Sequence, residues 1–138
     1  MKTTNRNRIL ALAALALATV SCKATEHVIV ADLAGEAGGS VEIHWTQPTG
    51  QTLPPVEARS PLSSGLEIKA LKVLAFEDIN GDWDAQEDEV RASAFGRVAY
   101  TGNWLKTGAM TIPTSGPLLC KAQVETTAGV TQKVWVVR

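Results

Sequence analysis

The chain has 138 residues, of which 13 are basic and 14 are acidic, so its net charge at neutral pH is −1. This balance argues against a nucleic-acid partner and against basic adhesion to anionic lipids, because both need an excess of positive charge. With 45% hydrophobic residues and two cysteines, the chain is long enough for one folded unit whose core does not depend on disulfides.

Residues 1–21 have the composition of a secretory signal. Lys2, Arg6 and Arg8 precede an uncharged apolar run over residues 9–20, which is the order found in signal peptides. These twelve residues are too few to span a bilayer, which takes about 20. We therefore expect residues 1–21 to be removed and the remaining chain to be extracytoplasmic.

Cys22 follows directly, at the end of Leu17-Ala18-Thr19-Val20-Ser21-Cys22. This stretch resembles the lipobox of bacterial lipoproteins, although Thr19 stands where leucine is usual. We expect lipid at Cys22 to anchor the protein to a membrane, with residues 22–26 as a tether and Cys120 as a buried free thiol. The alternative is cleavage nearby, for example after Ala24, which would give a soluble periplasmic or secreted protein in which Cys22 could pair with Cys120.

From residue 27 onward, short apolar segments rich in β-branched residues alternate with Gly, Pro, Asn and Asp, as in proteins built of strands. Residues 120–125 alternate strictly between apolar and polar side chains, which indicates a half-buried strand. The pattern predicts an all-β domain over residues 27–138, an antiparallel β-sandwich of immunoglobulin-like or prealbumin-like type. The seven predicted strands are His27–Leu33, Ser40–Trp45, Leu66–Phe76, Val90–Thr101, Trp104–Ile112, Leu118–Glu125 and Val130–Val137.

Three segments depart from simple alternation. Residues 47–65 contain four prolines, so we expect a long surface loop with at most a short edge strand. In residues 66–77 the apolar positions slip by one phase at Ala70-Leu71, for which we favour a β-bulge within a strand over a short helical turn. Residues 130–137 are apolar on both faces near their end, so we expect this strand to be central or covered.

Seven of the 14 acidic residues lie within residues 77–89. Carboxylates this close repel one another, and a divalent cation with six to eight oxygen ligands would offset the repulsion. Asp78, Asn80 and Asp82 have the i, i+2, i+4 spacing with which a curled loop brings side chains onto one Ca²⁺ ion. The alternative is an acidic hairpin that stays solvated and binds nothing.

The segment over residues 66–100 resembles part of a known family. Loops of the type Asp-x-Asn-x-Asp-Gly-x-x-Asp-x-Gly-Glu connect strands in secreted bacterial prealbumin-like and carboxypeptidase-regulatory-like β-sandwiches and in adhesin repeats. In these proteins an apolar strand leads into the loop, as Val73-Leu74-Ala75-Phe76-Glu77-Asp78 does here. The resemblance implies a Ca²⁺ loop between two strands of a sandwich.

The ligand set depends on how the loop is aligned. The usual loop has glycine at its sixth position, where this chain has Trp83. Without a gap, Glu89 is the twelfth-position carboxylate; with a two-residue deletion, Asp84 and Glu87 take the ninth and twelfth positions, and we favour the gapped alignment. We expect Trp83 to be exposed beside the ion as a contact for a ligand or partner. The predicted ligands are Asp78, Asn80, Asp82, Asp84 and Glu87.

Catalytic patterns are weak elsewhere. Glu42, His44 and His27 could be imagined around zinc, but two histidines without a cysteine cluster or a His-Glu-x-x-His pattern are a weak signal. We therefore expect no enzyme, but a binding or structural protein whose partner is an unidentified protein or glycan. The alternative is a carbohydrate-binding or accessory subunit of a cell-envelope enzyme, for which a site lined by Trp45 and Trp104 would be the sign.

Overall fold

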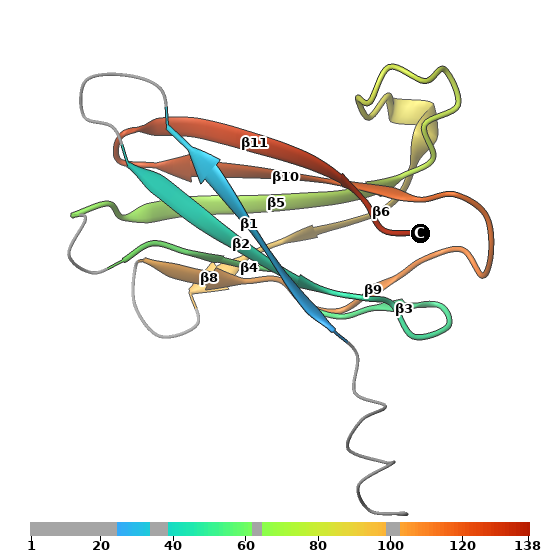
Figure 1. The fold of residues 1–138 in the computed structure, drawn as a ribbon, viewed down its shortest axis with the longest axis horizontal. Coiled ribbons are helices and arrows are strands. Elements are labelled where there is room, and N and C mark those ends of the chain that lie inside the picture. Colours follow the sequence, from blue (N-terminus) through green and yellow to red (C-terminus); the bar gives the residue numbers. More distant parts are fainter. Residues whose placement is uncertain (1–24, 34–38, 62–64, 99–102) are drawn as a thin grey trace, which may run out of the picture.

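A computed structural model describes residues 25–33, 39–61, 65–98 and 103–138 (Figure 1). In these ranges the one helical element is a 3-10 turn, η2 (Glu87–Glu89), and no helix there is long and apolar enough to cross a membrane. The strands are β1 (Glu26–Asp32), β2 (Ser40–Thr46), β3 (Thr52–Leu53), β4 (Glu57–Arg59), β5 (Ile68–Phe76), β6 (Val90–Phe95), β7 (Arg97–Val98), β8 (Trp104–Lys106), β9 (Met110–Thr111), β10 (Leu119–Thr126) and β11 (Gly129–Val136).

The strands form two main antiparallel sheets. One has the order β1-β2-β4-β8-β7 and the other β11-β10-β5-β6, while β3 pairs with β9 in a small third sheet. The main sheets lie face to face (Figure 1) and contribute to one hydrophobic core. The all-β, antiparallel prediction is therefore confirmed, and the layering is consistent with a β-sandwich.

Alternation of side chains builds this core. In β2, Val41, Ile43 and Trp45 are buried, whereas the residues between them face outward. Each fully buried large aliphatic or aromatic side chain contributes about 1.5–3 kcal/mol of transfer free energy. The largest fully buried apolar side chains come from all three sheets and from the segment before β10, and they include Phe76, Ile43, Leu53, Leu71 and Leu118.

Two predicted strands are divided between sheets. The segment predicted as Val90–Thr101 forms β6 in one sheet and β7 in the other, and its last residues lie outside the described ranges. The crossing occurs at Gly96, whose N–H donates to the Leu71 carbonyl at 2.7 Å. A Cβ at position 96 would lie 2.7 Å from Leu71 Cβ, so the close approach requires glycine. Similarly, residues 104–112 divide into β8 and β9.

The phase slip in β5 is a β-bulge. Ala70 pairs with Glu125 and Ile68 with Thr126, so Lys69 is the extra residue on β5. Ile68 and Leu71 are both buried even though they are three residues apart, because the bulge shifts the strand by one position. The prediction of a bulged strand is thus confirmed.

Two predictions about strand position were wrong. Residues 47–65 are not simply a surface loop, because they include β4, a central strand of the five-stranded sheet, and the fully buried Val56 and Ala58. Strand β11 is an edge strand and not a central one. Its Trp135 faces the core, while Val136 is half exposed.

Candidate metal site in the acidic loop

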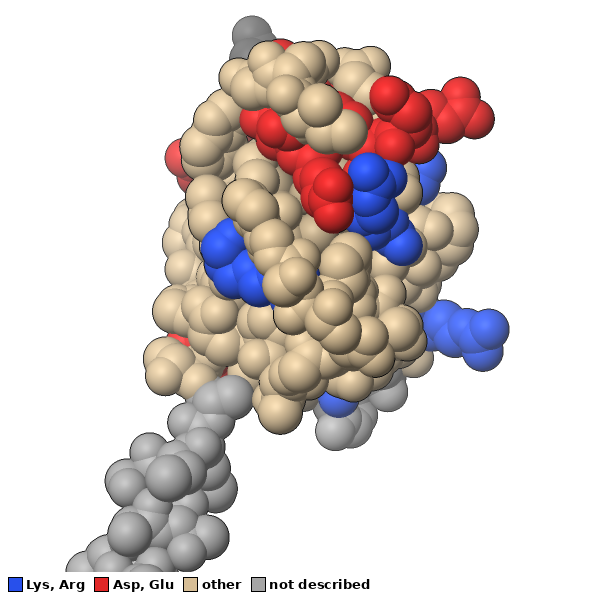
Figure 2. Space-filling view, turned by 90° about the vertical axis from the view of Figure 1, so that its right-hand side faces the viewer, with Lys and Arg blue, Asp and Glu red and all other residues tan. Residues whose placement is uncertain are grey.

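The acidic loop, residues 77–89, connects β5 to β6 at one end of the four-stranded sheet (Figure 1). Its base is closed by the Glu77 N–H, which donates to the Glu89 carbonyl at 3.0 Å. Figure 2 shows that acidic side chains gather at this end of the molecule. The loop is thus a localised source of negative charge held between two paired strands.

Glu89 is the only buried acidic residue among the described residues, with 2% of its surface exposed. Its Oε2 accepts the Ile79 N–H at 2.7 Å, and its Oε1 accepts the Gln86 N–H at 2.9 Å. Because both carboxylate oxygens hold backbone donors from opposite sides of the loop, Glu89 clasps the loop at its neck.

The side chains at the i, i+2, i+4 positions turn inward on one another. Asp78 accepts the N–H groups of Asp82 at 3.2 Å and Trp83 at 3.0 Å through its two carboxylate oxygens. The Asn80 amide donates to Asp82 Oδ2 at 3.1 Å. As a result, Asp78, Asp82 and Glu89 each offer a carboxylate oxygen within 4.8 Å of the other two.

Trp83 has a left-handed backbone with φ of 59°, and no other non-glycine residue in the described ranges has a positive φ. This conformation costs an ordinary side chain about 1–2 kcal/mol, and here the hydrogen bond from Trp83 N–H to Asp78 accompanies it. The residue is 53% exposed, as expected from the sequence. Trp83 therefore adopts a turn conformation that glycine adopts more readily.

The other two predicted ligands point elsewhere. Asp84 Oδ1 accepts Lys121 Nζ at 2.8 Å and the Ala85 N–H at 2.9 Å, which fastens the loop to β10. Glu87 is exposed and does not belong to the group of converging oxygens. The structure thus brings Asp78, Asn80 and Asp82 together with Glu89, the carboxylate of the ungapped alignment.

Hydrogen bonds and charge set the acidity of two loop carboxylates. The Asp84 N–H, followed by the Gln86 and Asn80 side chains, lowers the pKa of Asp82. The Lys121 ammonium lowers the pKa of Asp84 by a hydrogen bond and by its charge, and the Ala85 N–H adds to this effect. Both carboxylates therefore stay ionised to lower pH than a free aspartate.

The Lys121→Gln variant is expected to raise the pKa of Asp84 toward its ordinary value, measured by NMR titration of the carboxyl carbon. A lowered pKa in the folded state stabilises the fold above the unfolded-state pKa, and this contribution disappears as the pH falls through the folded-state pKa. The free energy of unfolding should therefore fall less steeply with acidification below about pH 4 in Lys121→Gln than in wild type. The control is Lys72→Gln, on the neighbouring strand, and an equal effect of both variants would contradict the assignment.

The histidines do not assemble a zinc site. His44 Nδ1 lies 2.8 Å from Glu26 Oε1, and His44 Nε2 lies 3.8 Å from Glu42 Oε1. His27 points to the opposite face of the sheet, where its ring stacks on Trp45 at a centroid distance of 4.4 Å. Within the described ranges, the one group of three such ligands close enough for an ion is that of the acidic loop.

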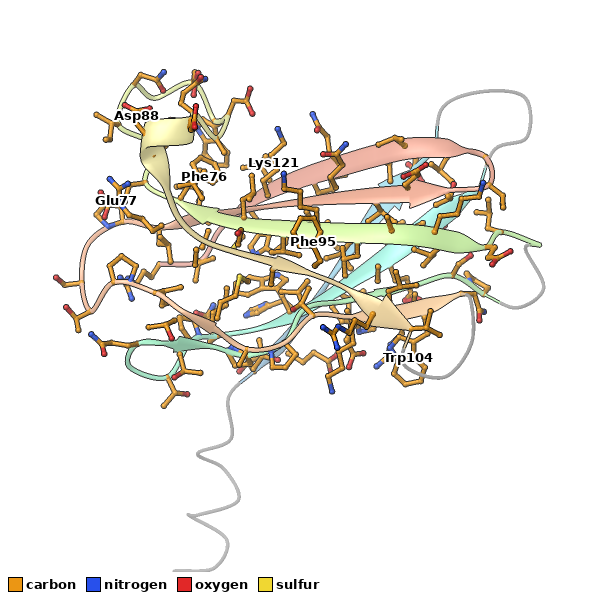
Figure 3. The ribbon with its side chains drawn as sticks, turned by 180° about the vertical axis from the view of Figure 1, so that it is seen from behind. Phe76, Glu77, Asp88, Phe95, Trp104 and Lys121 are labelled. Atoms are coloured by element: carbon orange, nitrogen blue, oxygen red, sulfur yellow. The ribbon has the colours of Figure 1, made fainter. Side chains whose placement is uncertain are left out.

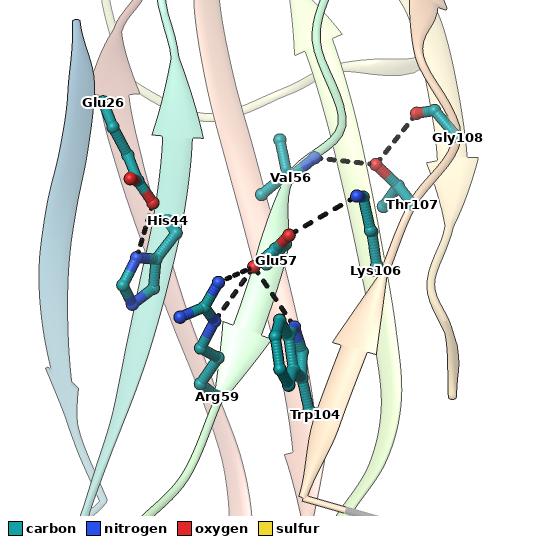
Figure 4. A network of polar contacts seen from close by, with 9 residues as sticks. All are labelled: Glu26, His44, Val56, Glu57, Arg59, Trp104, Lys106, Thr107 and Gly108. Atoms are coloured by element: carbon teal, nitrogen blue, oxygen red, sulfur yellow. Dashed lines mark hydrogen bonds and ion pairs between the residues drawn. The ribbon is translucent and has the colours of Figure 1, made fainter. Parts of the chain in front are cut away.

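Trp45 and Trp104 do not line a common site. Trp45 is buried in the core and lies 5.8 Å from Trp135 between ring centroids. Trp104 lies on the outer face of the five-stranded sheet, where its indole N–H donates to Glu57 Oε2 at 3.1 Å and the Arg59 guanidinium covers its ring at 4.1 Å (Figure 4). The described geometry thus provides no paired tryptophan platform for a sugar.

Cys120 is a buried free thiol, and burial raises its pKa to about 12. A thiol that stays protonated at neutral pH is a poor nucleophile, so Cys120 acts as a small core residue. Cys22, its alternative partner and the predicted lipidation position, lies outside the described residues.

Comparison with known proteins gives no assignment. No protein-family model, curated protein or solved structure matches the chain. The described residues thus form a protein of antiparallel β-sheets, and the acidic loop, held closed by Glu89, connects two paired strands.

Proposed function

We propose that this chain is an exported, non-catalytic β-sandwich domain of immunoglobulin-like or prealbumin-like type whose acidic loop binds Ca²⁺. The bound ion would stabilise the loop or present the surface around Trp83 to a protein or glycan partner. The observation that carries the proposal is the convergence of oxygens from Asp78, Asp82 and Glu89 within 4.8 Å of one another. Three negative charges at this distance repel unless a cation or protons offset them.

The donor set fits calcium. Carboxylate and amide oxygens without sulfur or imidazole favour hard cations, and loops of twelve residues supply ligands from positions 1, 3, 5, 7, 9 and 12. Counted from Asp78, these positions include Asn80, Asp82 and Glu89. Position 7 contributes its backbone carbonyl in such loops, which leaves the Asp84 side chain free for Lys121. The bond between Lys121 and Asp84, together with the position of Glu89 beside Asp78 and Asp82, supports Glu89 over Glu87 as the twelfth-position ligand.

The cellular address is part of the proposal. Removal of residues 1–21 and lipid attachment at Cys22 would leave the short tether, residues 22–26, of which the last residue already begins β1. Extracellular calcium modules work at dissociation constants of about 10⁻⁴ to 10⁻³ M. In an extracytoplasmic domain, an affinity in this range would therefore be sufficient for the loop to hold Ca²⁺.

Differential scanning calorimetry with Ca²⁺ and with EDTA tests the function. At a Ca²⁺ concentration 100 times the Kd, binding to the folded state adds about 2.7 kcal/mol, so the melting temperature should rise by roughly 10 °C. The Asp78→Asn variant should lose most of this rise, and the matched variant Glu87→Gln should keep it. A wild-type melting temperature that is the same in EDTA and in Ca²⁺ at about 0.1 M, 100 times the weakest expected Kd, would contradict the proposal.

A further inference from the structure

A groove of about 500 Å³ lies where the chain passes from β6 to β7 and faces the end of β8. It is lined by Phe95, Arg97, Val98, Lys106, Thr107 and Gly108. Figure 3 shows Phe95 well away from Asp88 in the acidic loop, so the groove is separate from the candidate metal site. Its volume lies within the range of about 300–1,000 Å³ found for small-molecule sites.

The floor of the groove is held by a buried threonine. Thr107 is 3% exposed, and its Oγ1 accepts the Val56 N–H at 3.0 Å and donates to the Gly108 carbonyl at 2.9 Å. The two bonds of this hydroxyl are drawn in Figure 4. The Thr107 N–H also donates to the Val56 carbonyl at 2.9 Å. The bonds to Val56, the residue directly before β4, fix the bend that follows β8, so the groove is formed by well-anchored backbone.

The charges of the groove are unbalanced. Arg97 and Lys106 are register partners on the antiparallel strands β7 and β8, and like charges directly opposite each other destabilise a sheet. Lys106 Nζ lies 3.6 Å from Glu57 Oε1, whereas Arg97 has no ion pair among the described residues. None of the lining residues is acidic. An anion between the two cations would offset their repulsion.

Apolar side chains flank these cations. Phe95 is 68% exposed and Val98 is 62% exposed, although β6 and β7 are both edge strands. Charged residues on an edge strand hinder its pairing with a strand of another molecule. Large exposed apolar residues on the same edge have the opposite effect, because they favour association. The combination of two cations with two apolar side chains therefore suits a ligand with a charged head and an apolar body.

We propose that this groove binds a small amphipathic organic anion. The carboxylate of the ligand lies between Arg97 and Lys106, and its hydrocarbon part covers Phe95 and Val98. Binding is independent of Ca²⁺, because no residue of the acidic loop lines the groove.

Chemical-shift mapping by ¹H–¹⁵N NMR tests this site, with decanoate below its micelle concentration as the probe. Decanoate should shift the amides of residues 95–98 and 106–108 saturably, whereas acetate and decanol, which lack the tail or the charge, should bind at least tenfold more weakly. The Arg97→Gln variant should weaken decanoate binding at least tenfold, and the same spectra report whether it is folded. Lys106→Gln gives a second, independent loss.

The matched control is Lys133→Gln on β11, outside the groove, which should leave the affinity unchanged. Equal binding of decanol and decanoate, equal affinity of wild type and Arg97→Gln, or shifts only outside the groove would each overturn the proposal. The same titration in EDTA separates this site from the metal site, because loss of Ca²⁺ should not change the decanoate affinity.

Discussion

The Glu89→Ala variant should lower the free energy of unfolding by about 3 kcal/mol in the absence of Ca²⁺. The substitution removes the acceptor of two backbone N–H groups, those of Ile79 and Gln86. A donor left unsatisfied in a buried position costs about 1–3 kcal/mol, and water reaches the neck of the loop poorly because Glu89 itself is 2% exposed. Urea denaturation in EDTA measures the effect directly.

Glu87→Ala is the matched control, because Glu87 is an exposed carboxylate two residues away. Exposed substitutions of this kind change stability by about 0.5 kcal/mol or less. Glu89→Ala should also abolish the rise in melting temperature caused by Ca²⁺, which gives a second readout. Equal unfolding free energies for the two variants in EDTA would show that the clasp contributes nothing to the fold.

The second large effect is expected at Gly96. Gly96→Ala should destabilise the protein by about 1–3 kcal/mol, because the new methyl would lie 2.7 Å from Leu71 Cβ, an atom that no rotation of the Leu71 side chain can move away. The backbone of β6 or β5 would have to shift, which would also lengthen the 2.7 Å hydrogen bond from Gly96 N–H to the Leu71 carbonyl.

Gly108→Ala serves as its control, since a Cβ at position 108 would meet nothing within 4 Å. Replacement of glycine at an unstrained position reduces the entropy of the unfolded chain and stabilises by about 0.4–1 kcal/mol. Thermal denaturation of both variants should thus give shifts of opposite sign. A melting temperature of Gly96→Ala equal to that of wild type would contradict the packing argument.

Much of the fold follows from local patterns, because alternation of side chains is a direct consequence of strand geometry. The positions of β1, β2, β5 and β10 agree closely with prediction, and even the bulge at Lys69 is visible as a phase slip. Strand β4 was not predicted because its three residues are too few to show the alternation of apolar and polar side chains. The prolines around it lie outside β3 and β4 and therefore break neither strand.

Strand position within a sheet is harder to predict. The apolar outer residues of β11 suggested a central strand, yet Val130 and Val136 are 57% and 50% exposed at a sheet edge. Apolar residues at the surface are common in folded proteins, so a two-sided apolar strand does not require cover. Pairing order depends on contacts between distant segments, which no local pattern reports.

The candidate metal site was predicted in part. The spacing of Asp78, Asn80 and Asp82 predicts that these side chains lie close together. The gapped alignment, which preserves the Trp83-Asp84-x-x-Glu87 pattern, selects Glu87 as the last carboxylate. In the structure Gly81 and Trp83 both have positive φ, and Glu89, the twelfth residue counted from Asp78, is the carboxylate that lies near Asp78 and Asp82. The groove at Arg97 and Lys106 could not be predicted from the sequence, because these residues become neighbours only through the pairing of β7 with β8.

The crossing of the chain from one sheet to the other at Gly96 also affects how the protein unfolds. Strands β6 and β7 are separated by one residue and belong to different sheets, so neither sheet can move far without pulling on the edge of the other. A short covalent link of this kind opposes sliding of the two layers. The layers are therefore expected to unfold as one cooperative unit, with no intermediate in which one sheet survives alone.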